Sequence, residues 1–251
     1  MKFYLYFGFI LTFLSCENNV SSIKKSKENR LNTKQIINQK KDSSIIKLNK
    51  VILLDSLVDI QTINSEIQVD LKYASSDNFM KMKLYNRLSN AYLQKDVAIR
   101  LSNCQKFLSK IKPGYCLLVY DAVRPVSVQK KMWDALDSLP PSERGKFVSN
   151  PVNRSLHNLG AAVDLTIIDN TGVILDMGAN YDDIRKIAYP NLEREFLASG
   201  ELSANHIANR ELLRRVMKSQ GFRPLETEWW HFNACSRSEG KSKYKVLMDE
   251  P

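Results

Sequence analysis

Histidine is scarce in this sequence, which has only three histidines among its 251 residues. They are His157, His206 and His231. A metal site that uses two histidine ligands can therefore be assembled in few ways, so the neighbours of each histidine decide whether it is a candidate ligand.

Cysteine is also sparse, and none of the four cysteines stands in a C-x-x-C pair. Zinc sites built from thiolates normally show such a spacing, so the sequence argues against one. Cys104, Cys116 and Cys235 leave room for one disulfide in an oxidising compartment, but nothing in the sequence selects the pair.

Internal repeats at periods of about 20–50 residues are not visible, and no linker interrupts residues 51–251. Domains contain roughly 100–200 residues, and hydrophobic residues make up 43% of the sequence, enough for a sizeable core. We therefore expect one folded domain over 51–251.

A long apolar run occurs only at the beginning. Residues 1–16 carry one charge, at Lys2, and an apolar run that ends at Ser15 and Cys16. The run is too short to span a bilayer and fits the hydrophobic region of a secretory signal. We expect a bacterial lipoprotein leader lipidated at Cys16, which would anchor the protein in the cell envelope, facing the periplasm. An ordinary secretory leader or an uncleaved anchor is the alternative.

Residues 17–50 lack both proline and glycine and are rich in Asn, Ser and Lys. They hold nine Lys/Arg and three Asp/Glu, so this segment supplies much of the formal net charge of +10. We expect a flexible basic tether. Such a tether fits an anionic membrane surface better than a nucleic-acid groove. We therefore expect a membrane partner and no nucleic acid, and the sequence indicates no protein partner.

Hydrophobic periodicity predicts a mixture of helices and strands after residue 51. Three-and-four spacing predicts helices over 89–111, from Ser127 onward and over 206–220. Compact apolar or aromatic runs predict strands over 115–122, 162–168, 173–176 and 226–232, with a hairpin turn at 169–172. This order favours an α+β domain with a central antiparallel sheet flanked by helices.

Two short segments combine histidine with a carboxylate. In S-L-H-N-L-G-A-A-V-D, His157 lies seven residues before Asp164, and in E-W-W-H, Glu228 lies three residues before His231. Hydrolytic zinc usually takes three nitrogen or oxygen ligands and keeps a position for water. Glu228 lies within about 11 Å of His231 along the chain, close enough for a general base. The alternative is a histidine that only makes hydrogen bonds in a turn, which Gly160 would favour equally.

The segment D-A-V-R-P, residues 121–125, ends a predicted buried strand. A strand end is a rigid place from which Arg124 could stabilise a developing oxyanion. The alternative is a surface arginine paired with Asp121.

These three segments, in this order and with these gaps, resemble the zinc D-alanyl-D-alanine dipeptidases of the vancomycin-resistance type. The resemblance runs from about Val69 to Phe232. It includes V-D-L-K-Y-A-S-S-D-N-F at 69–79, D-M-G-A-N-Y-D at 176–182 and N-R-E-L-L-R-R-V-M-K-S-Q-G-F at 209–222. It implies the fold shared by hedgehog domains and D,D-peptidases.

The resemblance also implies a chemical role for five residues. His157, Asp164 and His231 match the ligands of one zinc ion. Glu228 matches the general base, and Arg124 matches the arginine that stabilises the tetrahedral intermediate. The implied activity is hydrolysis of the dipeptide D-alanyl-D-alanine in the cell envelope, linked to peptidoglycan turnover.

Three further residues match positions that line the substrate pocket: Tyr73, Ser155 and Asp182. Asp182 would help to hold the ammonium group of the dipeptide. Trp229 and Trp230 are expected in the pocket wall and the core. His206 lies outside the metal motif, and we expect it to be structural or near the pocket rim.

Two other functions stay open at this point. A related zinc D,D- or L,D-carboxypeptidase that trims peptidoglycan stem peptides would use the same fold and metal ligands. A lipid-anchored binding protein with a silent metal site is the second alternative. A binding module needs neither a base at Glu228 nor an oxyanion partner at Arg124, so these residues favour an enzyme.

Overall fold

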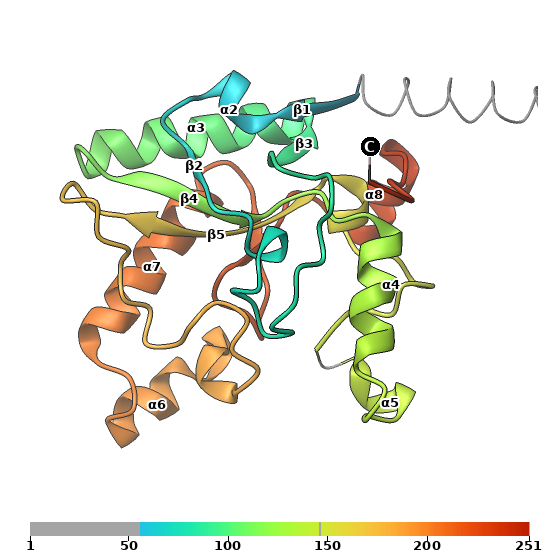
Figure 1. Ribbon diagram of the computed structural model, residues 1–251. Helices are drawn as coiled ribbons and strands as arrows, with labels where there is room; N and C mark the ends of the chain where they lie inside the picture. Colours follow the sequence, from blue (N-terminus) through green and yellow to red (C-terminus); the bar gives the residue numbers. More distant parts are fainter. Residues whose placement is uncertain (1–55, 146, 251) are drawn as a thin grey trace, which may run out of the picture. The chain divides into compact units, whose positions relative to one another are not determined.

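The computed structural model describes residues 56–145 and 147–250 (Figure 1). The expected leader, the expected lipidation residue Cys16 and the expected tether at 17–50 all lie outside the described residues. None of the helices formed by the described residues combines the length and apolar character needed to cross a membrane.

A five-stranded sheet forms the centre of the fold, in the order β2-β4-β5-β7-β6. The strands are β2 (Gln68–Val69), β4 (Cys116–Asp121), β5 (Ala162–Ile168), β7 (His231–Asn233) and β6 (Arg223–Pro224). All neighbours are antiparallel except β2 and β4, which are parallel. The expected α+β class with a largely antiparallel central sheet is confirmed, with that one parallel pair as the difference.

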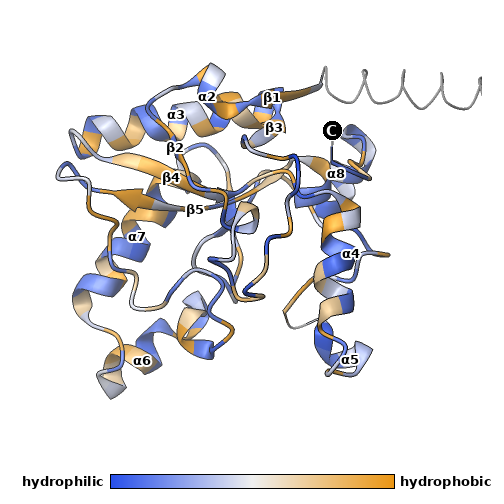
Figure 2. Ribbon diagram, viewed as in Figure 1, coloured by the Kyte–Doolittle hydropathy of each residue, from blue (hydrophilic) through white to orange (hydrophobic). Residues whose placement is uncertain are grey.

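The two longest strands, β4 and β5, consist largely of apolar residues (Figure 2), with Asp164 and Thr166 as the polar residues within β5. Both are buried on two faces, which explains why their sequences show continuous apolar runs rather than alternation. Alternation within β5 still places Val163, Leu165 and Ile167 on one face and Asp164 on the other. The sheet can therefore bury a core on one side while it presents a carboxylate on the opposite side.

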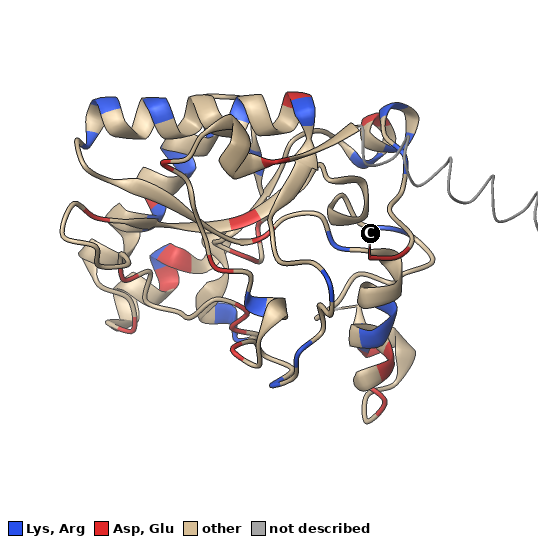
Figure 3. Ribbon diagram, turned by 45° about the horizontal axis from the view of Figure 1, so that its top comes forward, with Lys and Arg blue, Asp and Glu red and all other residues tan. Residues whose placement is uncertain are grey.

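Two long helices, α3 (Lys95–Ile111) and α7 (Ala204–Lys218), pack against each other. Arg100 of α3 donates to the carbonyl oxygen of Gln220, just beyond α7, at 2.9 Å. Lys and Arg residues recur along α3 (Figure 3), while most of its apolar residues are buried. This is the distribution expected of a helix with one face in the core.

The predicted helix over 89–111 begins later than expected. Tyr92–Gln94 instead form β3, which pairs with β1 (Leu57–Asp59) in a two-stranded antiparallel sheet. Leu93 is buried in β3. An apolar residue is equally expected on the buried face of a helix, so its apolar character could not distinguish a strand from a helix. The other end is as expected, because α3 stops before Pro113 and Gly114, where φ is +83°.

The remaining elements are short helices around this framework. They are α2 (Ile60–Ile63), η1 (Lys72–Ala74), α4 (Val126–Ala135), α5 (Pro141–Arg144), η2 (His157–Leu159), η3 (Lys186–Ala188), η4 (Pro190–Leu192), α6 (Glu193–Ser199) and α8 (Arg237–Lys243). The helices expected from Ser127 and over 206–220 correspond to α4 and α7.

The predicted hairpin after β5 is only partly formed. Asp169 makes the expected turn, with its backbone N–H bonded to the carbonyl oxygen of Val173 at 2.9 Å. Beyond it, a single bridge joins Ile168 to Ile174 in place of a paired strand. Val173 and Ile174 are 59% and 46% exposed, so this run lacks the buried face that would stabilise a longer strand.

The aromatic run at 226–232 is likewise mostly a turn. Only His231 and Phe232 belong to β7, and the backbone N–H of His231 bonds to the carbonyl oxygen of Glu228 at 3.4 Å. Trp229 and Trp230 are each 4% exposed and belong to the core. Burial of large aromatic side chains, rather than strand pairing, accounts for their occurrence here.

The cysteines form no disulfide among the described residues: Cys104, Cys116 and Cys235 are free thiols. Cys104 lies in α3, and burial raises the pKa of its thiol to about 12. A thiol of this kind is a core residue without reactivity.

Candidate metal centre and catalytic cleft

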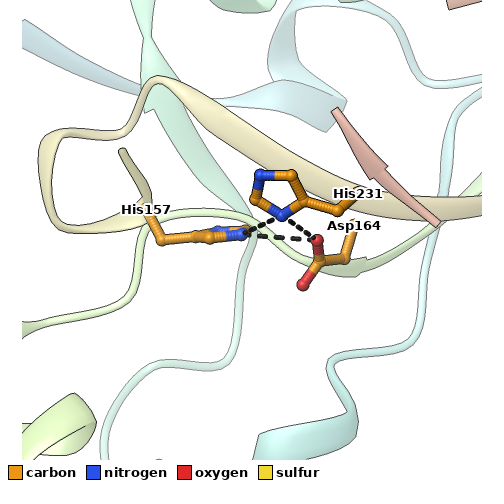
Figure 4. Close-up of side chains that lie close together, drawn as sticks. All are labelled: His157, Asp164 and His231. Carbon is orange, nitrogen blue, oxygen red and sulfur yellow. Dashed lines mark hydrogen bonds and ion pairs between the residues drawn. The ribbon is translucent and has the colours of Figure 1, made fainter. Parts of the chain in front are cut away.

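His157, Asp164 and His231 converge on one point, although they come from three separate elements (Figure 4). Asp164 of β5 and His231 of β7 are directly opposite each other in the antiparallel register. His157 comes from η2, immediately before β5. One ligand atom from each residue lies within 4.8 Å of the other two.

The individual distances show how tight the cluster is. His231 Nδ1 lies 2.9 Å from Asp164 Oδ1 and 3.2 Å from His157 Nε2. His157 Nε2 lies 3.3 Å from the same carboxylate oxygen. All three side chains are 12% exposed or less.

Gly160 makes the return from η2 into β5 possible. Its φ is +63°, a conformation that other residues rarely adopt. A Cβ at this position would lie 2.7 Å from Leu57 Cδ2 and 3.2 Å from the backbone N of Gln94. The glycine therefore serves both the left-handed turn and a close approach to β1 and β3, and this turn brings His157 back over Asp164.

The second nitrogen of each histidine ring fixes its tautomer. His157 Nδ1 donates to the carbonyl oxygen of Ala122 at 2.6 Å, and His231 Nε2 donates to Asn233 Oδ1 at 2.9 Å. His157 Nε2 and His231 Nδ1 then turn their lone pairs toward each other and toward Asp164. Such a group of acceptors needs a cation at its centre, and two nitrogens with one carboxylate oxygen are a donor set that zinc accepts.

Electrostatics keep Asp164 ionised. Burial acts to raise its pKa, but His157 and His231 outweigh burial and hold the pKa well below its usual range. Burial likewise acts to lower the pKa of His231, while the Asp164 carboxylate raises it to about 9. Asp164 thus has a strong affinity for positive charge at this position, which a proton or a metal ion can satisfy.

Glu228 lies beside this cluster. Its Oε2 is 3.7 Å from His231 Nδ1, and its side chain is 34% exposed to the cleft. Desolvation raises the pKa of Glu228, and the positive charge of His231 partly offsets this effect. A carboxylate with a raised pKa next to a metal-ligand cluster is suited to accept and return a proton.

Arg124 is both paired with Asp121 and placed at the cleft, so the two interpretations of D-A-V-R-P are compatible. Its Nε and Nη2 donate to Asp121 Oδ2 at 2.8 and 2.6 Å, and its Nη2 lies 3.5 Å from Asp164 Oδ2. Its side chain is 10% exposed and Asp121 is fully buried, so the pair is not a surface pair. Asp121 in turn accepts from Tyr85 Oη at 2.5 Å.

The three expected pocket residues line the same cleft as the cluster. Tyr73 Oη donates to Asp182 Oδ1 at 3.1 Å. Asp182 Oδ2 is buried without a hydrogen-bond partner among the described residues, and Asp182 has φ of +59°. Burial raises the pKa of Asp182 well above its usual range. Ser155 Oγ donates to Gln129 Oε1 at 2.8 Å.

Residue pattern alone did not identify several residues that support the site. Tyr181 Oη donates to Asp164 Oδ2 at 3.3 Å. Asn158 donates through Nδ2 to the carbonyl oxygen of Arg124 at 2.7 Å, and its Oδ1 accepts from the backbone N–H of Ser155 at 2.8 Å. Strand alternation could have found Asn233, since it lies two residues beyond His231 in β7 and on the same face.

His206 lies outside the cluster, as expected. It forms a capping box with Ser203 at the start of α7, and its Nε2 lies 3.1 Å from Asp176 Oδ2. Trp230 lines the cleft and packs its ring edge-on against Tyr181, with centroids 5.4 Å apart. These placements agree with a structural His206 and a wall formed by tryptophan.

Comparisons with known proteins agree with this geometry. The family model described as D-ala-D-ala dipeptidase, peptidase M15, matches residues 54–246. A D-alanyl-D-alanine dipeptidase of Escherichia coli is 32% identical over 194 residues, covering 77% of this chain and 90% of the relative. One of Enterococcus faecium is 28% identical over 202 residues, covering 74% and 88%.

Among solved structures, the LdcB LD-carboxypeptidase aligns with a TM-score of 0.41 and 19% identity, over 74% of this chain and 71% of that chain. The family model spans nearly all of the described residues, including the three residues of the cluster, Glu228 and Arg124. This chain therefore belongs to the peptidase M15 family, the family of the D-ala-D-ala dipeptidases.

Proposed function

We propose that this protein is a zinc peptidase that hydrolyses the dipeptide D-alanyl-D-alanine. The observation that supports this most is the convergence of two histidine lone pairs and one carboxylate, with Glu228 Oε2 3.7 Å from His231 Nδ1. The cleft that contains them has a volume of about 350 Å³, which suits a short peptide. The family membership supplies the substrate class.

His157, Asp164 and His231 hold one zinc ion in this proposal. When bound, zinc lowers the pKa of an attacking water to about 7 and polarises the scissile carbonyl. Glu228 takes a proton from that water and returns it to the leaving amine. Arg124 donates hydrogen bonds to the oxygen on which negative charge develops. Its pairing with Asp121 holds the guanidinium in place before the substrate arrives.

The polar end of the pocket selects a free amino terminus. Asp182 Oδ2 is buried without a partner among the described residues, and Tyr73 holds the other oxygen. An ammonium group would supply the missing donor and favour the ionised carboxylate. An N-blocked peptide has no such donor, so this arrangement favours a dipeptidase over a carboxypeptidase.

The test is to incubate the zinc-loaded protein with D-alanyl-D-alanine and with an N-blocked stem pentapeptide and to measure free D-alanine. Release from the dipeptide alone is expected. Release from the pentapeptide alone would favour the D,D- or L,D-carboxypeptidase, and release from neither would favour a binding module. Glu228→Ala should abolish turnover and retain zinc, whereas loss of zinc would mean that Glu228 is a ligand.

We further propose that the protein is anchored in the cell envelope by a lipid at Cys16, where the dipeptide would come from peptidoglycan turnover. The support is the residue pattern of 1–16 alone. Labelling with a radioactive fatty acid, compared between the wild type and Cys16→Ala, tests the anchor. Recovery of the unlabelled protein from the cytoplasmic fraction with residues 1–16 intact would refute it.

A further inference from the structure

The catalytic cleft continues past His231 to two arginines that have no role in the chemistry described above. Arg223, at the start of β6, and Arg237, at the start of α8, line the same cleft as the metal cluster. Arg223 belongs to β6, which pairs with the edge of β7 opposite to β5, and Arg237 belongs to α8, which follows β7 in the chain. A cleft that already contains the reacting groups therefore extends into a basic region.

The strand register places Arg223 close to the metal cluster. Arg223 is directly opposite Asn233 in the antiparallel β6–β7 pair. Asn233 accepts from His231 Nε2 at 2.9 Å and lies two residues from His231 in the same strand. His231, Asn233 and Arg223 thus share one face of the sheet, and diagonal neighbours on such a face are about 7–8 Å apart. An arginine side chain spans that distance easily.

The charge of both guanidinium groups is poorly neutralised. The Arg223 side chain is 62% exposed, and its ion pair with the exposed Glu239 is 4.0 Å long. Arg237 is exposed, and its guanidinium has no hydrogen bond or ion pair with any residue in the described ranges. Arg124 differs in this respect, since Asp121 already occupies two of its donors. Arg223 and Arg237 therefore keep donors free for a ligand.

The cleft thus has an acidic end and a basic end, with the metal cluster between them. At one end Asp182 accepts a hydrogen bond from Tyr73 Oη, and Tyr181, the residue before Asp182, donates to Asp164 of the cluster. On the other side, His231 Nε2 donates to Asn233 Oδ1, and Arg223 is the cross-strand partner of Asn233. A zwitterionic peptide has the same arrangement, with an ammonium at one end and a carboxylate at the other.

We propose that Arg223 and Arg237 form an anion subsite that binds a carboxylate of the peptide substrate, an inference that rests on the proposed peptidase function. Guanidinium groups bind carboxylates through paired N–H donors, which gives direction as well as charge. The carboxylate has two possible sources. It is either the free C-terminus of the dipeptide or an acidic side chain of a longer peptide.

Binding to zinc-loaded Glu228→Ala protein tests the subsite without turnover. Calorimetry compares D-alanyl-D-alanine, its C-terminal amide, and a peptide that carries an acidic residue and an amidated C-terminus. Each ligand is measured with and without Arg223→Gln plus Arg237→Gln. Arg194→Gln, an exposed arginine of α6 that does not line the cleft, is the matched control. Circular dichroism and zinc content confirm that each variant is folded.

Loss of a charge-assisted contact should lower the affinity for the ligand that carries the carboxylate by about tenfold or more. Weaker binding of the free dipeptide but not of its amide assigns the subsite to the C-terminal carboxylate. Weaker binding of the acidic peptide alone assigns it to a side chain. Equal affinities with and without the arginines, or no binding of any ligand to the parent protein, would overturn the subsite. Release of D-alanine by the wild type tests the peptidase function separately.

Discussion

Replacing Asp121 by asparagine would remove the buried negative charge that positions Arg124. Asp121 Oδ2 accepts from Arg124 Nε and Nη2 at 2.8 and 2.6 Å, and its Oδ1 accepts from Tyr85 Oη at 2.5 Å. Asparagine has nearly the same shape but only one acceptor oxygen. Its amide nitrogen must then face either the guanidinium or the tyrosine hydroxyl, so one of the two interactions is lost.

The magnitude follows from the burial of the pair. Removing one partner of a buried ion pair costs about 3–5 kcal/mol because the other charge is left uncompensated. The retained acceptor oxygen offsets part of this, so we expect the free energy of unfolding to fall by about 3 kcal/mol. Arg124 would also lose its orientation. Because removing one oxyanion donor lowers kcat about 10²–10³-fold, a fall of that order is expected while zinc remains bound.

Urea denaturation of the zinc-loaded protein measures the loss of stability, with an unchanged m-value as the sign that the unfolding reaction is the same. Asp134→Asn is the matched control, because Asp134 pairs with Lys130 on the surface of α4 and both side chains are more than half exposed. Loss of this surface ion pair should lower the free energy of unfolding by about 0.3–0.5 kcal/mol. If Asp121→Asn costs no more than this control and leaves kcat intact, Asp121 does not hold Arg124 in the way the geometry indicates.

Three further predictions concern the metal, the turn and the chain end. Removing zinc from the zinc-loaded protein with a chelator should lower Tm. Adding zinc should restore Tm but adding magnesium should not, because nitrogen ligands do not suit magnesium. An unchanged Tm after chelation would exclude a resident metal. Gly160→Ala should lower zinc affinity and stability, because φ is +63° and the new Cβ would lie 2.7 Å from Leu57 Cδ2. Gly200→Ala is the control, because φ is also positive there but the space around the new Cβ is open, so only backbone strain is expected. Equal losses of stability in both variants would show that the lack of space at Gly160 is not the cause. The Glu250 carboxylate accepts from three backbone N–H groups of 86–88, and although burial acts to raise its pKa, these donors lower it. Its stabilising effect is thus complete above the ordinary pKa of about 4.3 and is lost as the pH falls through the lowered value. Glu250→Gln should therefore reduce the unfolding free energy at neutral pH by about 1–3 kcal/mol and have little effect in strong acid, and a difference that grew on acidification would refute this assignment.

Some features of the fold could be predicted from local sequence. The helix α7 follows from apolar spacing with Gly221 after its end, and β4 and β5 follow from continuous apolar runs. These patterns reflect interactions over a few residues, which the sequence displays directly. Two predictions were wrong: residues 92–94 were predicted as the start of a helix but form the strand β3, and residues 226–230 were predicted as a strand but form a turn. The conformations of both segments depend on partners that are distant in the chain.

The sequence by itself determined the residue types of the site and their order: His157 and Asp164 with a glycine turn between them, Glu228 three residues before His231, and Arg124 at the end of a buried strand. Only the tertiary structure decided that Asp164 and His231 are cross-strand neighbours, although 67 residues separate them. It also decided which ring nitrogens turn inward and that a basic region extends the cleft. Strand register and hydrogen bonds between distant segments fix these features, and no local pattern encodes them.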